Sequence, residues 1–238
     1  MRTISLSSSL TKKKRIMDTF EKIVEKISFY RDHSVLVFAS SAQKDGCNVV
    51  ATECAKILAA RGKNVLLIDT DLRNTVESKY GVGLSEYLAG QAQWGDIFCQ
   101  TDCPRLYTIP SGQTPPNPTE LLSSKAFGSL LSGARSTFDY VILSTSPLSS
   151  YVDGALVAVR CDGAILVLSS RRTKEKEATE AKRLLKKSGC KILGAVLNAM
   201  TVAEAEPIPE AEDKKEPVSA QKEKRPANKK ADVFEEEE

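Results

Sequence analysis

The chain has 238 residues, of which 41% are hydrophobic and 6% aromatic, so it can bury the core of one domain but is too poor in aromatics to bind nucleic acid by base stacking. Residues 204–238 hold twelve Asp or Glu against seven Lys or Arg, which gives a charge of −5 there and +8 on residues 1–203. This asymmetry favours a basic body that meets anions, such as a nucleotide, an acidic protein or a membrane surface. Solubility alone is the alternative explanation.

The six cysteines are scattered, and because His33 is the only histidine, we expect no Cys/His zinc site. No apolar run approaches the roughly 18 residues that a membrane span requires. The basic segment at residues 12–15 is not followed by an apolar stretch, so we expect no signal peptide. These features predict a cytoplasmic protein with reduced thiols.

Residues 1–15 are rich in Ser and Lys and are expected to be flexible. Beyond them, short apolar runs alternate with segments of helical periodicity. The expected strands cover 34–40, 64–69, 106–109, 140–143, 163–168 and 192–197. The expected helices cover 16–29, 49–60, 83–88, 94–98, 120–122 with Thr119 as a candidate cap, 125–136, 152–160 and 174–188.

This alternation predicts an α/β fold over residues 16–203, with a doubly wound, mostly parallel sheet and helices on both faces. Residues 204–238 are rich in Pro, Glu, Lys and Ala and have almost nothing to bury, so they are predicted to be a disordered charged tail. Within this tail, Val233 and Phe234 form a candidate docking element.

Ligands of an open parallel sheet bind beyond the carboxyl ends of its strands. Three polar loops follow such ends here, at residues 40–49, 69–73 and 144–147. We therefore expect these three loops to meet at one site.

Several motifs carry a family resemblance. They are Val-Leu-Leu-Ile-Asp-Thr-Asp-Leu-Arg at 65–73, Gly-Leu-Ser-Glu-Tyr-Leu-Ala-Gly at 83–90, Ile-Pro-Ser-Gly at 109–112, Pro-Pro-Asn-Pro-Thr-Glu-Leu-Leu-Ser-Ser at 115–124 and Phe-Asp-Tyr-Val-Ile-Leu at 138–143. With these motifs, residues 16–200 resemble the cytoplasmic bacterial tyrosine kinases of capsule and exopolysaccharide synthesis, in the deviant Walker A branch of the P-loop proteins. The resemblance implies a P-loop NTPase-like fold, with ATP and Mg²⁺ as cofactors.

The nucleotide-binding loop departs from the family pattern, Ser-x-x-Pro-Gly-Glu-Gly-Lys-Ser/Thr. Such a loop holds phosphates on backbone N–H groups, with Lys on the β- and γ-phosphates and Ser or Thr on Mg²⁺. Cys47 stands at the lysine position and Asn48 at the Mg²⁺ position, while Gly46 keeps its role beside Asp45. Lys44 occupies a glycine position, and replacement of the missing lysine by Lys44 remains an alternative.

Two further contacts with an anion remain open. A helix N-terminus at Val49 still attracts negative charge. Asn198 stands where related proteins contact the adenine, although a turn residue at the end of a strand is an equal explanation.

The expected metal site is also altered. Asp69 and Asp71 are retained, and the resemblance implies that they help to hold Mg²⁺ and activate the attacking hydroxyl. The structural alternative is that they are helix N-cap residues or acids of a loop. Ser144 replaces the Asp that orients the Mg²⁺-bound water in the family, and Ser146 replaces a Pro. With Asn48, Asp69 and Ser144 at the metal positions, we expect little Mg²⁺ binding.

The family's substrate and assembly features are changed as well. The kinases carry a C-terminal tyrosine cluster, but no tyrosine follows Tyr151 in this sequence. They form rings through a Glu-x-x-Arg-x-x-Arg helix, and the matching positions Asp18, Glu21 and Val24 offer no arginine. The resemblance thus implies a homo-oligomer, but the motif that forms the ring in the family is degenerate in this sequence.

These departures predict a non-catalytic relative, a pseudokinase that regulates or scaffolds polysaccharide synthesis. An active ATP-dependent tyrosine kinase, with Asp69 and Asp71 as catalytic residues, is the first alternative, and a partition-type ATPase is the second. The resemblance also implies a membrane co-polymerase as activator. Because we expect no transmembrane segment here, that partner would be a separate chain that holds this protein at the inner face of the membrane.

Overall fold

The computed structural model describes residues 2–4, 6, 14–30, 34–74 and 81–199, so the predicted disordered tail and the Val233-Phe234 element lie outside the described residues. One eight-stranded sheet runs through the domain in the order β1-β4-β5-β3-β6-β2-β7-β8, and only the β4–β5 pair is antiparallel. The strands are β1 (Arg2–Ile4), β2 (Val35–Ser40), β3 (Val65–Asp69), β4 (Cys99–Thr101), β5 (Leu106–Ile109), β6 (Tyr140–Ser144), β7 (Gly163–Ser169) and β8 (Ile192–Asn198). The predicted mostly parallel α/β sheet is confirmed.

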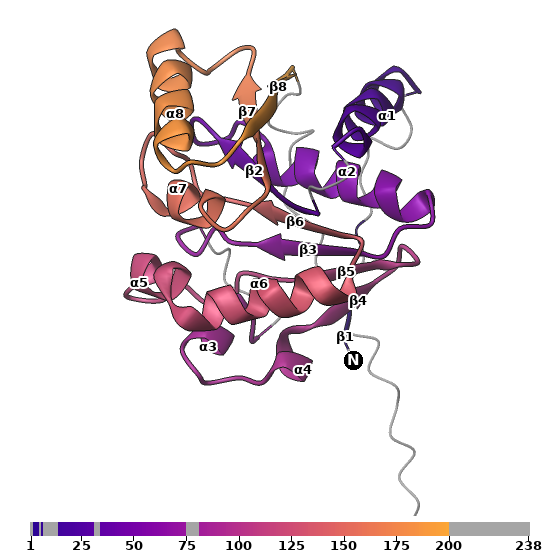
Figure 1. The fold of residues 1–238 in the computed structure, drawn as a ribbon, viewed down its shortest axis with the longest axis vertical. Helices are drawn as coiled ribbons and strands as arrows, with labels where there is room; N and C mark the ends of the chain where they lie inside the picture. Colours follow the sequence, from indigo (N-terminus) through magenta and orange to yellow (C-terminus); the bar gives the residue numbers. More distant parts are fainter. Residues whose placement is uncertain (1, 5, 7–13, 31–33, 75–80, 200–238) are drawn as a thin grey trace, which may run out of the picture.

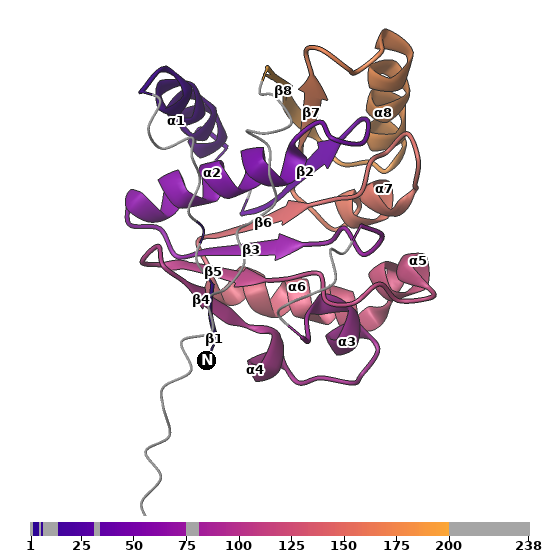
Figure 2. The same cartoon turned by 180° about the vertical axis from the view of Figure 1, so that it is seen from behind.

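Helices cover both faces of the sheet, as Figure 1 and the reverse view in Figure 2 show for α6 and α2. The helices are α1 (Lys14–Ser28), α2 (Cys47–Ala60), α3 (Leu84–Leu88), α4 (Trp94–Ile97), α5 (Pro118–Ser123), α6 (Lys125–Thr137), α7 (Asp153–Ala158) and α8 (Glu175–Lys187). The core on one face joins α1 and α2, and the core on the other joins α3 to α8. Because the central strands are covered on both faces, they are apolar at most positions, as in β2, where all six residues are buried and only the last, Ser40, is polar.

The sheet contains two strands that sequence analysis does not predict. The expectation of a flexible N-terminus is wrong for Arg2–Ile4, which pair in parallel with Cys99–Thr101. Both strands have three residues, and β4 exposes its central Gln100. Runs this short show no hydrophobic periodicity, and their position depends on ladder hydrogen bonds that the sequence does not reveal.

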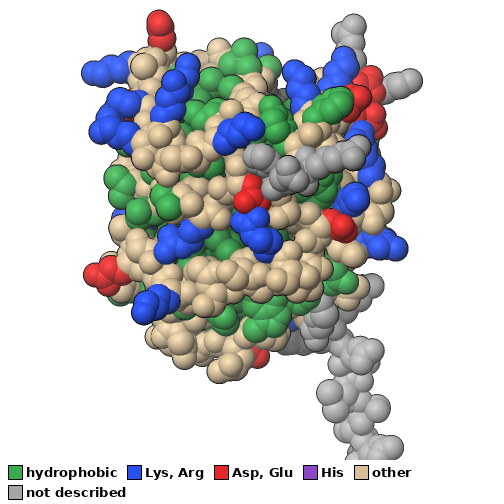
Figure 3. All heavy atoms as spheres, in the orientation of Figure 1, with side chains coloured by type: hydrophobic (Ala, Val, Ile, Leu, Met, Phe, Trp, Pro, Cys, Tyr) green, Lys and Arg blue, Asp and Glu red, His purple; other side chains and the backbone are tan. Residues whose placement is uncertain are grey.

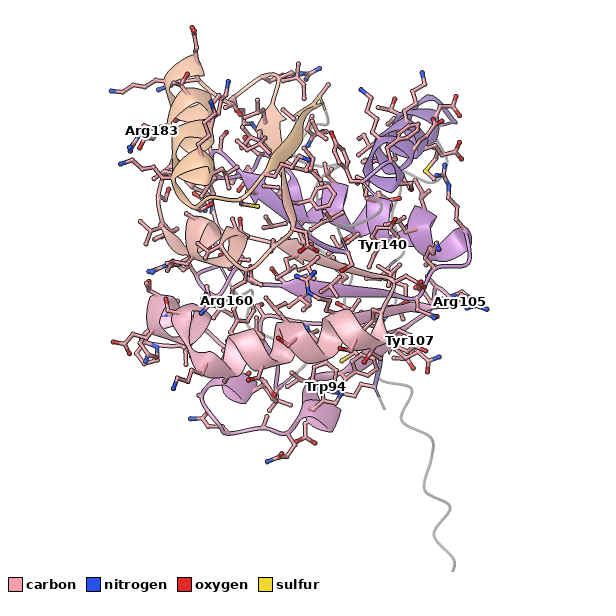
Figure 4. All side chains as sticks on the ribbon, in the orientation of Figure 1. Trp94, Arg105, Tyr107, Tyr140, Arg160 and Arg183 are labelled. Atoms are coloured by element: carbon pink, nitrogen blue, oxygen red, sulfur yellow. The ribbon has the colours of Figure 1, made fainter. Side chains whose placement is uncertain are left out.

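An aromatic stack packs beside β5 at the far side of the sheet from β8. The ring of Phe98 lies parallel to those of Trp94 and Tyr107, with centroids 5.5 and 5.0 Å apart, and Phe138 closes the cluster. Figure 4 shows Trp94 and Tyr107 in this part of the molecule. The stack fixes α4 against the sheet by aromatic contact.

We expect the core to be sensitive to loss of volume at α6. Phe127 is 0% exposed, and Phe127→Ala should lower the free energy of unfolding by about 3–5 kcal/mol because it removes buried contacts and leaves a cavity. Urea denaturation measures the change. Phe29 is 77% exposed, so Phe29→Ala is the matched control and should change stability by less than about 0.5 kcal/mol; equal effects of the two substitutions would contradict this assignment of the core.

Candidate functional site

The carboxyl ends of β2, β3 and β6 lie side by side. Ser144 at the end of β6 is in register with Asp69 of β3 on one side and with Phe38 of β2 on the other. The loop after β6 also bonds the loop after β2, since the Leu148 N–H donates to the Ser40 carbonyl at 3.0 Å. The predicted convergence of three strand ends is therefore confirmed.

The loop after β2 contains two residues in the left-handed region of the backbone. Gly46 has φ 79° and caps α2, and Lys44 has φ 67°, a left-handed conformation that favours glycine. Lys44 thus occupies a glycine-type position, and its side chain is exposed. The helix begins at Cys47, two residues before the predicted start at Val49, so the prediction placed this helix N-terminus too late.

Cys47 is buried at the start of α2. Its Sγ donates to the Phe38 carbonyl at 3.0 Å, and the residue is only 7% exposed. Burial raises the pKa of Cys47 to about 12, and the carboxylates of Asp69, Asp71 and Asp45 add to the rise. The thiol is therefore neutral and faces the core, so it supplies no charge to a bound anion.

Asn48 stands at the second position of α2, where the family has a hydroxyl. Its Oδ1 accepts a hydrogen bond from Thr52 Oγ1 at 3.5 Å, one turn further along the helix. Like the hydroxyl that it replaces, the amide oxygen is neutral, and unlike a carboxylate it brings no negative charge to Mg²⁺. The residue is partly exposed, as is Val49 beside it.

Asp45 lies under the loop and holds it together. It is 1% exposed, and its Oδ2 accepts hydrogen bonds from Ser41 N at 3.1 Å, Ser41 Oγ at 2.7 Å and Ala42 N at 2.8 Å. Its Oδ1 accepts a hydrogen bond from Thr173 Oγ1 at 2.9 Å. A buried carboxylate requires such partners, and here they fix the loop to the segment after β7.

Asn198, at the end of β8, joins the same network. Its side chain is buried, and Nδ2 donates to the Asp45 carbonyl at 2.8 Å. Asn198 therefore lies beside the loop and joins β8 to it. Contact with an adenine stays a prediction.

Asp69 is half-buried at the end of β3 and accepts two hydrogen bonds at Oδ1. The donors are Ser144 Oγ at 3.2 Å and the Asp71 N–H at 3.1 Å. Burial and the negative charge of Asp71 raise the pKa of Asp69 to about 6. No cation forms an ion pair with this carboxylate among the described residues.

The Asp71 carboxylate also accepts hydrogen bonds from neighbouring groups. Its Oδ1 accepts a hydrogen bond from Ser146 Oγ at 2.6 Å, and the N–H groups of Arg73 and Asn74 donate to the same oxygen. The two serines that replace family residues thus bond one aspartate each. Sequence analysis noted both serines but did not predict that they cap the acids.

The polar groups at this edge of the sheet differ from those that the family resemblance implies for Mg²⁺ and a nucleotide. In the described part of the chain, no group of three or more His, Cys, Asp or Glu side chains is placed to hold a metal ion. The lysine that would neutralise phosphates is replaced by a buried thiol, and both aspartates are bonded by hydroxyls. The three loops thus converge without a positive charge at position 47.

Arg73 organises the rim of the site, a role that sequence analysis missed. Its Nε donates to Asp153 Oδ2 at 2.5 Å, and Nη2 donates to Thr119 Oγ1 at 2.8 Å. The guanidinium also lies 4.3 Å from the centre of the Tyr151 ring. These contacts join the loop after β3 to α5 and α7, and thereby place the family motif at 115–124 beside the site.

No family model matches the chain, but individual proteins of known sequence are similar to it. The tyrosine-protein kinase CpsD of Streptococcus agalactiae serotype Ia is 38% identical over 203 residues, which are 82% of this chain and 88% of CpsD.

Solved structures of bacterial tyrosine kinases are also similar to this chain. The chimerical protein CapA2B2 superposes with a TM-score of 0.76 at 29% identity, over 84% of this chain and 93% of that protein. The kinase domain of the Escherichia coli tyrosine kinase ETK superposes with a TM-score of 0.74 at 26% identity, over 83% and 88% of the two chains.

We expect Asp45→Ala to lower the free energy of unfolding by about 2–4 kcal/mol, because four donors lose their shared acceptor inside the loop. Chemical denaturation measures the loss. Asp139 is exposed and accepts a hydrogen bond from Asn64 N at 2.7 Å, so Asp139→Ala should cost about 1 kcal/mol or less. If the two variants lost equal stability, the role of Asp45 would be refuted.

The raised pKa of Asp69 predicts a dependence on pH. The unfolded chain ionises this carboxyl at its ordinary pKa of 3.8, and the folded chain at about 6, so its contribution to stability falls as pH rises between these values. After a discount for partial exposure, Asp69→Asn should stabilise the protein by about 1–2 kcal/mol at neutral pH and by almost nothing near pH 4. Urea melts at several pH values measure this.

The control for this experiment is Asp18→Asn on the exposed side of α1, which should change stability by less than about 0.5 kcal/mol. If Asp69→Asn were no more stable than the wild type at neutral pH, the prediction that the Asp69 charge destabilises the fold would be wrong.

Proposed function

The chain belongs to the family of bacterial tyrosine-protein kinases, and on this premise we propose that it is a non-catalytic member, a pseudokinase. Its proposed role is to regulate or scaffold the synthesis of capsular polysaccharide or exopolysaccharide, as the family resemblance implies. The observation that carries the proposal is the Cys47 thiol, which stands at the lysine position and bonds the Phe38 carbonyl inside the core.

Phosphoryl transfer depends on positioning and on neutralisation of phosphate charge. Loss of one charged contact at such a centre costs roughly two to three orders of magnitude in rate. This chain has lost the lysine at position 47, the hydroxyl at 48 and the acid at 144. The effects of the three losses on the rate need not be additive. Each loss alone supports a strongly reduced rate of phosphoryl transfer.

The hydrogen bonds around the two aspartates support the same proposal. In a working site, Asp69 and Asp71 would turn toward Mg²⁺ and its water. Here Ser144 and Ser146 donate to them, which satisfies the carboxylates without a metal ion. These hydrogen bonds support a role for the site in which Mg²⁺ is not required.

An active ATP-dependent protein-tyrosine kinase remains the second candidate, because 38% identity to CpsD extends over most of the chain and both aspartates are retained. In that case, Asp69 and Asp71 would serve the reaction, and Lys44 would have to supply the missing positive charge. Membership of the kinase family makes a partition-type ATPase the weaker proposal.

We further propose that the partner is a membrane protein on a separate chain, which acts at the cytoplasmic face of the membrane. The family resemblance and the +8 charge of residues 1–203 support this. Among the described helices, none has the length and apolar composition needed to cross a bilayer.

Nucleotide binding and phosphorylation test the proposed function together. We expect titration of ATP with Mg²⁺ into the wild-type protein to give a Kd weaker than about 1 mM and no phosphotyrosine on the chain or on an added tyrosine-containing polymer. The combined variant Cys47→Lys, Asn48→Ser and Ser144→Asp should bind at least about tenfold more tightly, since it regains the phosphate and metal contacts. Calorimetry and phosphotyrosine detection give the two readouts.

The chain offers a matched control with the same three exchanges away from the site, namely Cys103→Lys, Asn64→Ser and Ser136→Asp. Asn64 and Ser136 are exposed and Cys103 is partly exposed, so this variant should fold and leave nucleotide binding unchanged. Micromolar binding by the wild type, together with phosphotyrosine formation, would refute the pseudokinase proposal.

A further inference from the structure

Strand β8 forms one edge of the sheet. Among the described residues it pairs only with β7, and it lies at the opposite end of the sheet from β1 (Figure 1). In a parallel pair, alternate N–H and C=O groups of an edge strand point away from the sheet. The outer side of β8 therefore offers a row of backbone donors and acceptors for another strand.

This edge lacks the usual protection against strand pairing. Natural edge strands are kept short, or they carry charges or proline. Strand β1 has three residues and includes Arg2, whereas β8 has seven residues with no charge and no proline. Gly194, Ala195 and Leu197 are exposed, and Leu197 is 67% exposed. An apolar edge of this length is expected to have a partner.

The start of β8 is surrounded by positive charge. Lys186 and Lys187 end α8, Lys191 directly precedes β8, and all three are exposed. Figure 3 shows Lys and Arg side chains gathered over the corner formed by α8, and Figure 4 shows Arg183 on the outer side of this helix. A strand that pairs with β8 is therefore favoured if it carries acidic residues at the end that meets these lysines.

The chain itself contains such a segment. The described residues end at Ala199, one position after β8, and 39 residues follow. They include Asp-Val-Phe-Glu-Glu-Glu-Glu at 232–238, which joins two large apolar side chains to an acidic run. The residues between β8 and this segment can span on the order of 100 Å when extended, far more than the roughly 23 Å length of β8.

We propose that residues 232–238 dock on the outer edge of β8 as an added antiparallel strand. In this direction, Val233 and Phe234 cover the exposed apolar side chains near Leu197, and the glutamates reach the lysines at the start of β8. Main-chain hydrogen bonds supply affinity, and the alternate side chains supply specificity. Because the segment is tethered to β8, its effective concentration is on the order of millimolar, so a weak intrinsic affinity is sufficient.

Hydrogen exchange of the full chain tests the proposal. At low salt, the outward-facing N–H groups of β8 should exchange at least about tenfold more slowly in the full chain than in a chain that ends at Ala231. Phe234→Ala and a variant with Glu235–Glu238 changed to Gln should both lose this protection. A peptide of residues 230–238, added to the shortened chain, should restore it, and the same peptide with Phe234→Ala should not.

The matched control changes four other acids of the tail, Glu210, Glu212, Asp213 and Glu216, to their amides and should keep the protection. Salt of about 0.5 M should weaken docking because exposed charges are screened. Equal exchange in the full and shortened chains would overturn the proposal. So would loss of protection in the control variant, or protection that rises with protein concentration, which would assign the edge to a second copy.

Discussion

The parallel pairing of β6 with both β2 and β3 is the constraint on which the site depends. Because the three strands run in one direction and their register is fixed by buried side chains on two faces, their carboxyl ends meet at one edge of the sheet. The loops at this edge cannot separate without breaking the central core. Changes of individual site residues therefore leave the geometry of the site in place, and the fold keeps its shape when the chemistry is altered.

The altered residues fit one another physically. A lysine at position 47 would need an anion, and an acid at position 144 would add a third negative charge beside Asp69 and Asp71. With Cys47 and Ser144 in their place, the thiol is buried and the hydroxyl donates to Asp69. The Asp45 carboxylate accepts hydrogen bonds from the backbone N–H groups of Ser41 and Ala42 in the same loop. The protein's own groups therefore supply hydrogen bonds to these carboxylates, although the negative charges of Asp69 and Asp71 still repel each other.

Much of the fold follows from the sequence, because the strands that build the centre of the sheet are continuous apolar runs. All six predicted strands are present, and the α/β class follows from their alternation with helices. The two three-residue strands, β1 and β4, were not predictable, since their position depends on pairing between segments distant in the chain. The start of α2 was predicted late because Cys47 and Asn48 resemble loop residues, while the left-handed Gly46 marks the true cap.

At the site, the sequence indicates which residues meet but not how their side chains turn. Cys47, Asp69 and Ser144 were placed together from the motif positions alone. The direction of the Cys47 thiol, the burial of Asp45 and the bond from Ser146 to Asp71 depend on the packing around each side chain. Arg73 was unremarkable in sequence because its partners, Thr119 and Asp153, come from two later elements.

Strand β1 has a consequence for how the domain is assembled during synthesis. Its partner β4 follows β2, β3 and the helices between them in the chain, so Arg2–Ile4 leave the ribosome long before Cys99–Thr101 exist. Contacts between such distant segments form late, after the loop that joins them has closed. Completion of the sheet edge at β1 therefore waits for the middle of the chain, and a polypeptide halted before β4 is made would hold its first residues without a place to pair.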